Sequence, residues 1–410
     1  MNLRQFFSHP PLRSIVLLWL AWLVILISFQ TLVLQRFEIR RPDRVLEWTP
    51  GDTGRHDSAQ EPSLTEPFLN TQVSMDSEYY LSIATVGYDD PLPGEMERPR
   101  GEPIKLNYAF FPAYPYLMRA VSIPLSIFGL NQIATATPAG VLVSALGALA
   151  AMVALYDLCR KELGDAGGLR AGFYLLIFPT GFFLAQLYTE GLFLGFSFVA
   201  LALMRRKHLI WASILAVIAV YTRAIGVALV IPLAYAWFQQ WRAGEQPRGR
   251  VLLNLAFVIL PLAAYALWRF SAWGEMFTLL EENYFGRKLF WLDVTWQSLT
   301  NAWSIVLAGK FQTSLYYGLE FGAIGLGIAA CVLTARRYPE IAFYSFIVLL
   351  IPLTSGYLQS NQRYVLAMPA LFLALARLGK NVVFDRVWSL LSILWVGFLA
   401  MLFSFDFWTA

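Results

Sequence analysis

The feature that most limits how this chain can fold is a series of separate apolar runs, several of them long enough to cross a membrane. The first run, residues 16–35, contains twenty residues and no charged side chain. A transmembrane helix needs about 20 consecutive apolar residues because the hydrocarbon core of a bilayer is about 30 Å thick. Of the 410 residues, 58% are hydrophobic and 14% are charged, whereas an ordinary soluble domain has about 25% charged residues. We therefore predict an all-α polytopic membrane protein, with residues 1–410 forming a single integral membrane domain.

Eleven apolar segments along the chain predict about eleven transmembrane helices. Several are short or interrupted by Gly or Pro, which membrane helices tolerate where protein rather than lipid surrounds them. The predicted limits are 14–35, 134–158, 169–187, 188–204, 208–222, 224–241, 251–270, 313–335, 341–356, 365–378 and 387–404.

The basic residues predict the orientation of these helices. With a cytoplasmic N-terminus, about half of the 31 Lys and Arg residues fall in short cytoplasmic loops, as the positive-inside rule requires. An odd number of spans then places the C-terminus outside. The two long connections, 36–133 and 271–312, become extracytoplasmic loops.

The first of these loops contains apolar stretches at 79–86 and 109–128. Both ends of the loop must lie outside, so neither stretch can be a single crossing. We expect helices that lie at the outer membrane interface. The stretches PSLTEPF and PLPGEMERPRGEP in the same loop predict irregular structure.

One polar constellation falls in the segment MDSEYYLSIATVGYDD of this loop. If the segment is helical, Asp76, Tyr79 and Tyr80 share one face. A carboxylate on the outer side of the first span could accept a proton from a hydroxyl nucleophile. Asp is also a favoured N-cap, and Asp76 stands where the helix would begin, so helix capping is the alternative role.

Three further charged residues map to the outer ends of predicted spans. They are Glu190 in QLYTEGLF, Arg223 in VYTRAIGVAL and Arg363 in TSGYLQSNQRYVLAMPALF, where Gln362 and Tyr364 add hydrogen-bonding groups. An acid at membrane depth is a functional candidate, and Arg matches phosphate oxygens bidentately. The alternatives are a polar outer turn for the acid and interfacial anchoring or snorkelling for the arginines. Together with the acid of the first loop, these residues suit a phosphate-bearing lipid donor and a hydroxyl acceptor.

Several other chemistries lack support in the sequence. The three histidines, His9, His56 and His208, form no metal-ligand spacing with Cys or Asp, so we expect no metal. No phosphate-cradling glycine loop is present, and we expect no cofactor. No Lys/Arg-rich run with interleaved aromatic residues suggests nucleic acid as a partner.

Five sequence blocks resemble those of a known family in the same order. DSEYYLSIATVGY resembles the D-x-x-x-Y-x-x-I-A-x-x-G-Y signature of the PIG-V family of mannosyltransferases. AFFPAYP, LYTEGLF, TRAIG and QRYVLAMP resemble its other blocks, and the set extends from residue 75 to residue 369. The sequence departs from the pattern at Glu78, which adds a second acid two residues after Asp76.

This resemblance implies a GT-C-type glycosyltransferase fold with a catalytic Asp in the first outer loop. Carried over by position, Asp76 is the general base, and Arg363 and Arg223 bind the donor phosphate. The remaining predicted pocket residues are Tyr79, Tyr80, Tyr188, Glu190, Gln362 and Tyr364, together with the additional acid Glu78.

The resemblance also implies a reaction and a location. Mannose would pass with inversion from a polyprenyl- or dolichyl-phosphate-mannose donor to a hydroxyl of a glycolipid, glycan or protein acceptor. The compact chain with basic inner turns favours a prokaryotic plasma membrane, with the ER membrane as the eukaryotic equivalent and membrane lipids as surroundings. Two alternatives stay open, namely another GT-C enzyme with a different lipid-phosphate sugar, and a transporter or lipid flippase without covalent chemistry.

Overall fold

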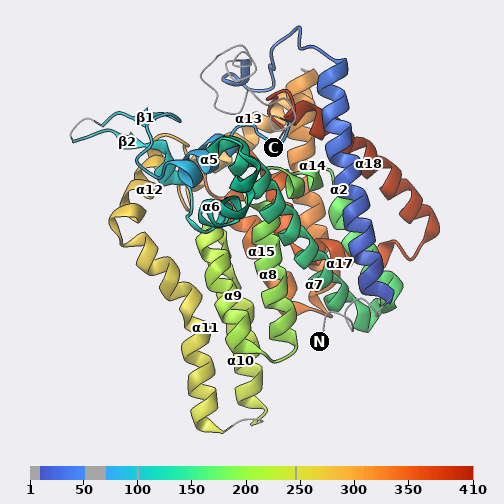
Figure 1. Cartoon of the computed structure of the whole chain (residues 1–410). Coiled ribbons are helices and arrows are strands. Elements are labelled where there is room, and N and C mark those ends of the chain that lie inside the picture. The colour runs from blue at the N-terminus through green and yellow to red at the C-terminus, as the bar shows by residue number, and fades with distance from the viewer. Residues whose placement is uncertain (1–9, 51–70, 99–100, 245–246, 310, 410) are drawn as a thin grey trace.

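A computed structural model describes residues 10–50, 71–98, 101–244, 247–309 and 311–409 of the chain. These residues form a bundle of helices with a layer of shorter helices gathered at one end (Figure 1). The stretch PSLTEPF, predicted to be irregular, lies outside the described residues.

Six helical segments in the described residues are long and apolar enough to cross a membrane, and three shorter apolar helices accompany them. The chain is thus a multi-pass membrane protein, as predicted, while the count of about eleven spans stays a prediction. The six segments are α2 (Pro10–Arg36), α7 (Gln132–Ile177), η5 with α10 (Ala224–Leu229 and Val230–Arg242), α11 (Arg248–Arg269), α14 (Phe311–Ala335) and α18 (Val382–Phe403). The three shorter helices are α9 (Leu209–Thr222), α15 (Pro339–Leu353) and α17 (Pro369–Leu378).

The structure agrees with the prediction that 134–158 and 169–187 begin two separate helices, and it corrects the end of the second of them. The element α7 joins two helices at Gly164, whose backbone is not helical (φ 68°, ψ −176°), and these two helices correspond to the segments predicted at 134–158 and 169–187. The helix ends at Ile177, so the span predicted over 169–187 is wrong beyond that residue. The cause is Pro179, because a residue before proline avoids the helical region, and Phe178 accordingly has ψ of 142°. The chain continues in a buried 3₁₀ turn, η4 (Gly181–Ala185).

The first outer segment contains the two predicted helices, α5 (Ser77–Thr85) and α6 (Ala113–Leu125) with its 3₁₀ extension η3 (Ser126–Phe128). Between them, PLPGEMERPRGEP is not wholly irregular. Strand β1 (Glu95–Met96) pairs antiparallel with β2 (Ile104–Lys105), and Glu95 forms an ion pair with Lys105 opposite it. Strands of two residues are too short to show the alternation that predicts a strand from sequence.

The second outer segment packs against the first. It contains α12 (Ala272–Asn283) and α13 (Leu292–Ala308), which lie at the same end of the molecule as α5 and α6 (Figure 1). Helix α12 contacts η2 (Leu106–Ala109), and the ring of Trp273 lies 4.5 Å from that of Tyr88. The two predicted outer loops therefore form one layer.

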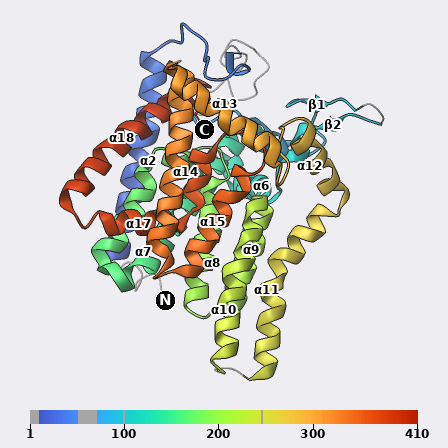
Figure 2. The same cartoon turned by 180° about the vertical axis from the view of Figure 1, so that it is seen from behind.

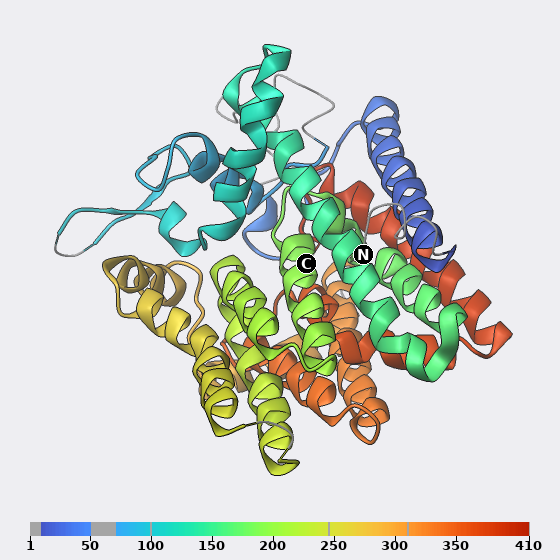
Figure 3. The same ribbon diagram turned by 60° about the horizontal axis from the view of Figure 1, so that its bottom comes forward.

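The bundle beneath this layer has a dense centre. Helices α7, α8 (Glu190–Arg205) and α17 supply about half of the buried residues of its main apolar cluster. From behind, α14 runs down the bundle beside α15 (Figure 2). From below, α2 and α18 lie at one side and the yellow helices, α11 and α12, at the other (Figure 3).

Glycine allows the closest helix contact in this centre. A Cβ placed on Gly191 would lie 2.0 Å from the carbonyl oxygen of Ser144, and one on Gly147 would lie 2.3 Å from the carbonyl oxygen of Gly191. Small residues let membrane helices approach backbone to backbone. This contact holds the first turn of α8 against α7, and that turn begins with Glu190.

Candidate active site

Asp76 stands at the N-cap position of α5, but its side chain makes no capping hydrogen bond. Its Oδ2 lies 3.4 Å from Nη1 of Arg363, and 30% of the side chain is exposed. The residue before it, Met75, has φ of 51°, in the left-handed region that non-glycine residues rarely adopt. Such backbone strain is concentrated at functional sites. The carboxylate is therefore directed toward a cation and remains open to solvent.

Hydrogen bonds fasten this segment to the loop before α8. The backbone N–H of Asp76 donates to the hydroxyl of Tyr188 at 3.2 Å, and that hydroxyl donates to the carbonyl of Ser74 at 3.1 Å. The hydroxyl of Ser77 donates to the carbonyl of Leu187 at 3.1 Å. Since Tyr188 is buried, these bonds position the start of α5 relative to the start of α8.

Glu190 joins the two arginines. It is 2% exposed, and its Oε1 pairs with Nη1 of Arg223 and lies 3.2 Å from Nε of Arg363. Its position in the first turn of α8 is also favourable for a negative charge, because the N-terminus of a helix carries partial positive charge. Its Oε2 is buried and has no hydrogen-bond partner in the described residues. A ligand hydroxyl could donate to this oxygen.

Arg223 owes its position to an interruption of the helical backbone between α9 and η5. Its backbone is extended, with φ of −153° and ψ of 137°, so the helix stops and the side chain turns into the protein. The guanidinium lies 5.1 Å from the ring centroid of Tyr364 and donates to Oγ1 of Thr189 at 3.3 Å. Snorkelling to the outer surface, the alternative role, does not describe this geometry.

Arg363 belongs to a short helix, α16 (Asn361–Tyr364), which follows Ser360 in the left-handed conformation at φ of 65°. Its side chain is 10% exposed. Its guanidinium lies 5.5 Å from the ring centroid of Phe183 and 5.4 Å from that of Tyr188, both favourable cation–π distances.

The four charged residues thus form one continuous chain of ion pairs, from Asp76 through Arg363 and Glu190 to Arg223. The ends of the Asp76–Arg363 contact are separated by 287 residues in the sequence. Two acids and two arginines balance in formal charge, which reduces the cost of burying them. The structure therefore brings together the four residues that the sequence placed at outer ends of spans.

Three other predicted pocket residues lie in the first turn of α5. The ring of Tyr80 meets that of Tyr188 edge-on at 6.4 Å, so it lines the same site. Tyr79 stacks on Phe110 at 4.5 Å, and Glu78 is half-buried in the first turn of α5.

Gln362 takes a different direction from Arg363. Its amide donates to the carbonyl of Thr409 at 2.7 Å. The structure therefore ties it to the C-terminal segment rather than to the chain of ion pairs.

Two residues of the second outer segment approach the site and escaped the sequence interpretation. Nη1 of Arg287 donates to the hydroxyl of Tyr364 at 3.3 Å. Burial raises the pKa of Glu281 to about 7, and the charges that act on it are those of Arg287, Asp76 and Arg223. Their only signal in the sequence was a position in the second predicted outer loop, where charged residues are usual.

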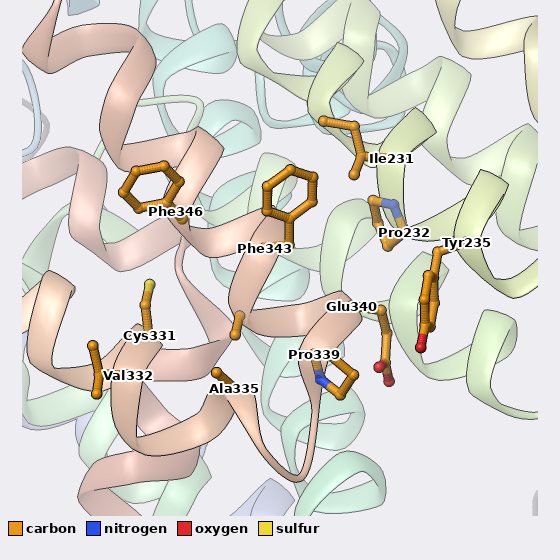
Figure 4. A pocket seen from close by; sticks show the side chains of 11 residues that line it. Ile231, Pro232, Tyr235, Cys331, Val332, Ala335, Pro339, Glu340, Phe343 and Phe346 are labelled. Atoms are coloured by element: carbon orange, nitrogen blue, oxygen red, sulfur yellow. The ribbon is translucent and has the colours of Figure 1, made fainter.

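A separate apolar pocket of about 550 Å³ lies among α10, α14 and α15 (Figure 4). Its lining includes Phe343, Phe346 and Tyr235, and its one charged residue, Glu340, pairs with Arg205. None of the four residues in the chain of ion pairs lines it. Within the described segments, no three His, Cys, Asp or Glu side chains gather closely enough to hold a metal ion.

The fold and the site define a multi-pass helical membrane protein with a charged, partly buried site beneath the layer of shorter helices at one end of the bundle. The family model for mannosyltransferases (PIG-V) matches residues 55–243 of the chain. This match confirms the resemblance found in the first four sequence blocks. The fifth block, with Arg363, lies beyond the matched range, and the structure connects it to the others.

The chain is similar to three solved structures, each with a TM-score below 0.5. ArnT from Cupriavidus metallidurans, bound to undecaprenyl phosphate, is 14% identical, with 83% of this chain and 63% of that chain covered and a TM-score of 0.45. The Archaeoglobus fulgidus oligosaccharyltransferase with Zn and sulfate is 16% identical, with 95% and 53% covered and a TM-score of 0.46.

The third is the A. fulgidus oligosaccharyltransferase AglB with an inhibitory peptide and a dolichol-phosphate. It is 15% identical, with 96% of this chain and 56% of that chain covered and a TM-score of 0.45. The chain thus spans less than two thirds of the length of each of these structures. Comparison with curated proteins gave no match.

Proposed function

We propose that this chain is a GT-C-type glycosyltransferase that moves mannose from a polyprenyl- or dolichyl-phosphate-mannose donor to a hydroxyl of a glycolipid, glycan or protein. The reaction takes place on the extracytoplasmic face of a membrane, the plasma membrane in a prokaryote. The observation that carries the proposal is the convergence of Asp76, Glu190, Arg223 and Arg363 from four separate family blocks into one chain of ion pairs.

Asp76 is the general base of the proposed reaction. Its Oδ2 faces Arg363, the side chain is partly exposed, and no capping bond occupies it. The acceptor hydroxyl gives its proton to this carboxylate while its oxygen bonds to the anomeric carbon of mannose. The bond from that carbon to the phosphate oxygen breaks on the opposite side, so the configuration inverts and the lipid phosphate leaves.

The arginines stabilise the leaving phosphate. Preorganised cations aimed at developing charge are the usual source of such electrostatic stabilisation. A monophosphate leaving group carries less charge than a pyrophosphate, so guanidinium groups suffice in this proposal and no metal is required. The unpartnered Oε2 of Glu190 is available to accept a hydrogen bond from a sugar hydroxyl.

The test uses purified protein in lipid nanodiscs with polyprenyl-phosphate [³H]mannose, a membrane lipid extract as acceptor source, and EDTA. The variant Asp76→Asn should lose transfer by roughly 100-fold or more, the usual contribution of a general base. Asp89→Asn is the matched control, since Asp89 is an exposed acid on the same outer loop.

The same assay, with lipid translocation measured in proteoliposomes beside it, separates the alternatives. Full activity in Asp76→Asn would remove the base from the proposal. Transfer from a different lipid-phosphate sugar, but not from the mannose donor, would favour another enzyme of the GT-C type. Movement of lipid across the membrane without transfer of any sugar would favour a transporter or flippase.

A further inference from the structure

We propose that Arg287 is a further phosphate-binding residue of this site and that, with the hydroxyl of Tyr364, it forms the anion position still open when the lipid-linked donor arrives. The inference rests on the proposed function and adds to it a residue of the second outer segment, outside the range that the family model matches.

The first support is the distribution of ion pairs. Arg223 and Arg363 both contact Oε1 of Glu190, and Arg363 also contacts Asp76. In the part of the chain that the structure describes, the side chain of Arg287 has no carboxylate partner, and its one hydrogen bond goes to the hydroxyl of Tyr364. Of the three guanidinium groups, Arg287 therefore holds the charge that no acid offsets by direct contact.

The second support is the geometry around Tyr364. Its ring centroid lies 5.1 Å from the guanidinium carbon of Arg223 and 5.8 Å from that of Arg287. Because the hydroxyl oxygen accepts a hydrogen bond from Arg287, the hydroxyl hydrogen can be donated to a phosphate oxygen. Guanidinium forks match phosphate oxygens in both geometry and charge.

The third support is the rigid attachment of this segment. The backbone N–H of Arg287 donates to the carbonyl of Glu281 at 2.7 Å, and that of Lys288 donates to the carbonyl of Ser355 at 2.9 Å. Gly286, with φ of 63°, makes the tight turn that these bonds require. The segment is thereby tied to the loop before α16, so the side chain of Arg287 is held in place before any ligand binds.

The experiment measures binding of polyprenyl phosphate, polyprenol and inorganic phosphate to the full chain in nanodiscs. Arg287→Gln should weaken binding of polyprenyl phosphate by roughly tenfold or more, the effect of losing one charge-assisted contact. Arg287→Lys should recover part of that loss, since it keeps the charge but not the fork. Lys288→Gln is the matched control, because Lys288 is an exposed cation one residue later and should change binding by less than about twofold.

Three results would overturn the inference. They are unchanged binding in Arg287→Gln, an equal loss in Lys288→Gln, and an equal loss for uncharged polyprenol, which would indicate a general disturbance. If Arg287→Gln lowers the melting temperature, binding of polyprenyl phosphate is compared between the wild type and Arg287→Lys instead. The inference would also be overturned if Arg287→Lys recovered none of the lost affinity. Weak binding of inorganic phosphate that also depends on Arg287 would show that the position recognises the phosphate itself rather than the lipid.

Mannosyl transfer by the wild type is measured in parallel. Binding of polyprenyl phosphate that depends on Arg287, without transfer, would refute the proposed function and support this inference. Transfer that is unaffected in Arg287→Gln would leave the proposed function standing and refute this inference. A wild type that does not bind polyprenyl phosphate would refute both.

Discussion

Glu190 should be the residue on which the stability of the charged site depends most. It is 2% exposed, and its Oε1 contacts two guanidinium groups, one of them that of Arg363, whose side chain is 10% exposed. Glu190→Gln keeps the shape but removes the charge, so Arg223 loses its acid partner and Arg363 retains only Asp76. Breaking a buried ion pair from one side costs about 3–5 kcal/mol. The remaining contact to Asp76 places our expectation near the lower limit, about 3 kcal/mol.

The assay is thermal unfolding of the purified variant in nanodiscs. A loss of about 3 kcal/mol in a chain of this size corresponds to a fall in Tm on the order of 5 °C. Mannosyl transfer should fall as well, because both arginines lose the group that orients them. Glu340→Gln is the control, since it removes an acid from a more exposed ion pair, with Arg205 at 32% exposure, and should cost less than about 1 kcal/mol.

The double variant Glu190→Gln with Arg363→Gln tests the pairing directly. If the two residues interact, the combined loss should be smaller than the sum of the single losses by about 1 kcal/mol or more. A Tm for Glu190→Gln equal to that of the wild type, or strict additivity in the double variant, would refute the assignment of Glu190 as the link between the arginines.

The remaining predictions concern the glycine contact and pH. Gly191→Ala should destabilise the protein strongly and lower the yield of monodisperse protein, because the new Cβ would lie 2.0 Å from a backbone oxygen of α7. Gly318→Ala is the control and should be tolerated, because its Cβ meets open space. Equal Tm values for the two variants would contradict the close contact. Burial raises the pKa of Glu281 to about 7, so this acid is neutral below that pH and ionised above it. The ionised form competes with phosphate for the positive charges of Arg287 and Arg223, and its negative charge adds to that of the Asp76 carboxylate. The KM for the donor should therefore rise between pH 6 and pH 8, the range that brackets the pKa of Glu281. In Glu281→Gln this rise should be absent, and a pH profile that matches the wild type would exclude Glu281 as its source.

Much of the architecture followed from local sequence alone. The apolar run at 16–35 predicted α2 because length and lack of charge suffice to specify a membrane helix. The apolar stretch at 79–86 likewise predicted the helix α5. The error in the third span arose because hydrophobicity continued past Pro179, and a hydropathy pattern does not register the conformational limit that proline imposes on the residue before it.

The candidate site was predictable only in part. Asp76, Glu190, Arg223 and Arg363 stood out because charged groups at the outer ends of apolar spans are costly and therefore informative. Their order along the chain did not reveal which acid pairs with which arginine, and it left open whether Asp76 caps α5. The structure settles the geometry, with the side chain of Asp76 directed to Arg363 rather than to the helix backbone.

Arg287, Glu281 and Gln362 show what tertiary structure alone decided. The first two are charged residues in a polar segment, where solvent makes charge inexpensive, so no local pattern separated them from their neighbours. Gln362 lies beside Arg363 in sequence, yet its side chain turns to Thr409. The sequence determined which helices are long and apolar enough to cross a membrane, because length and hydrophobicity are properties of each run alone. The partners of each polar side chain depended on contacts between segments as far as 287 residues apart, which exist only once the helices have packed.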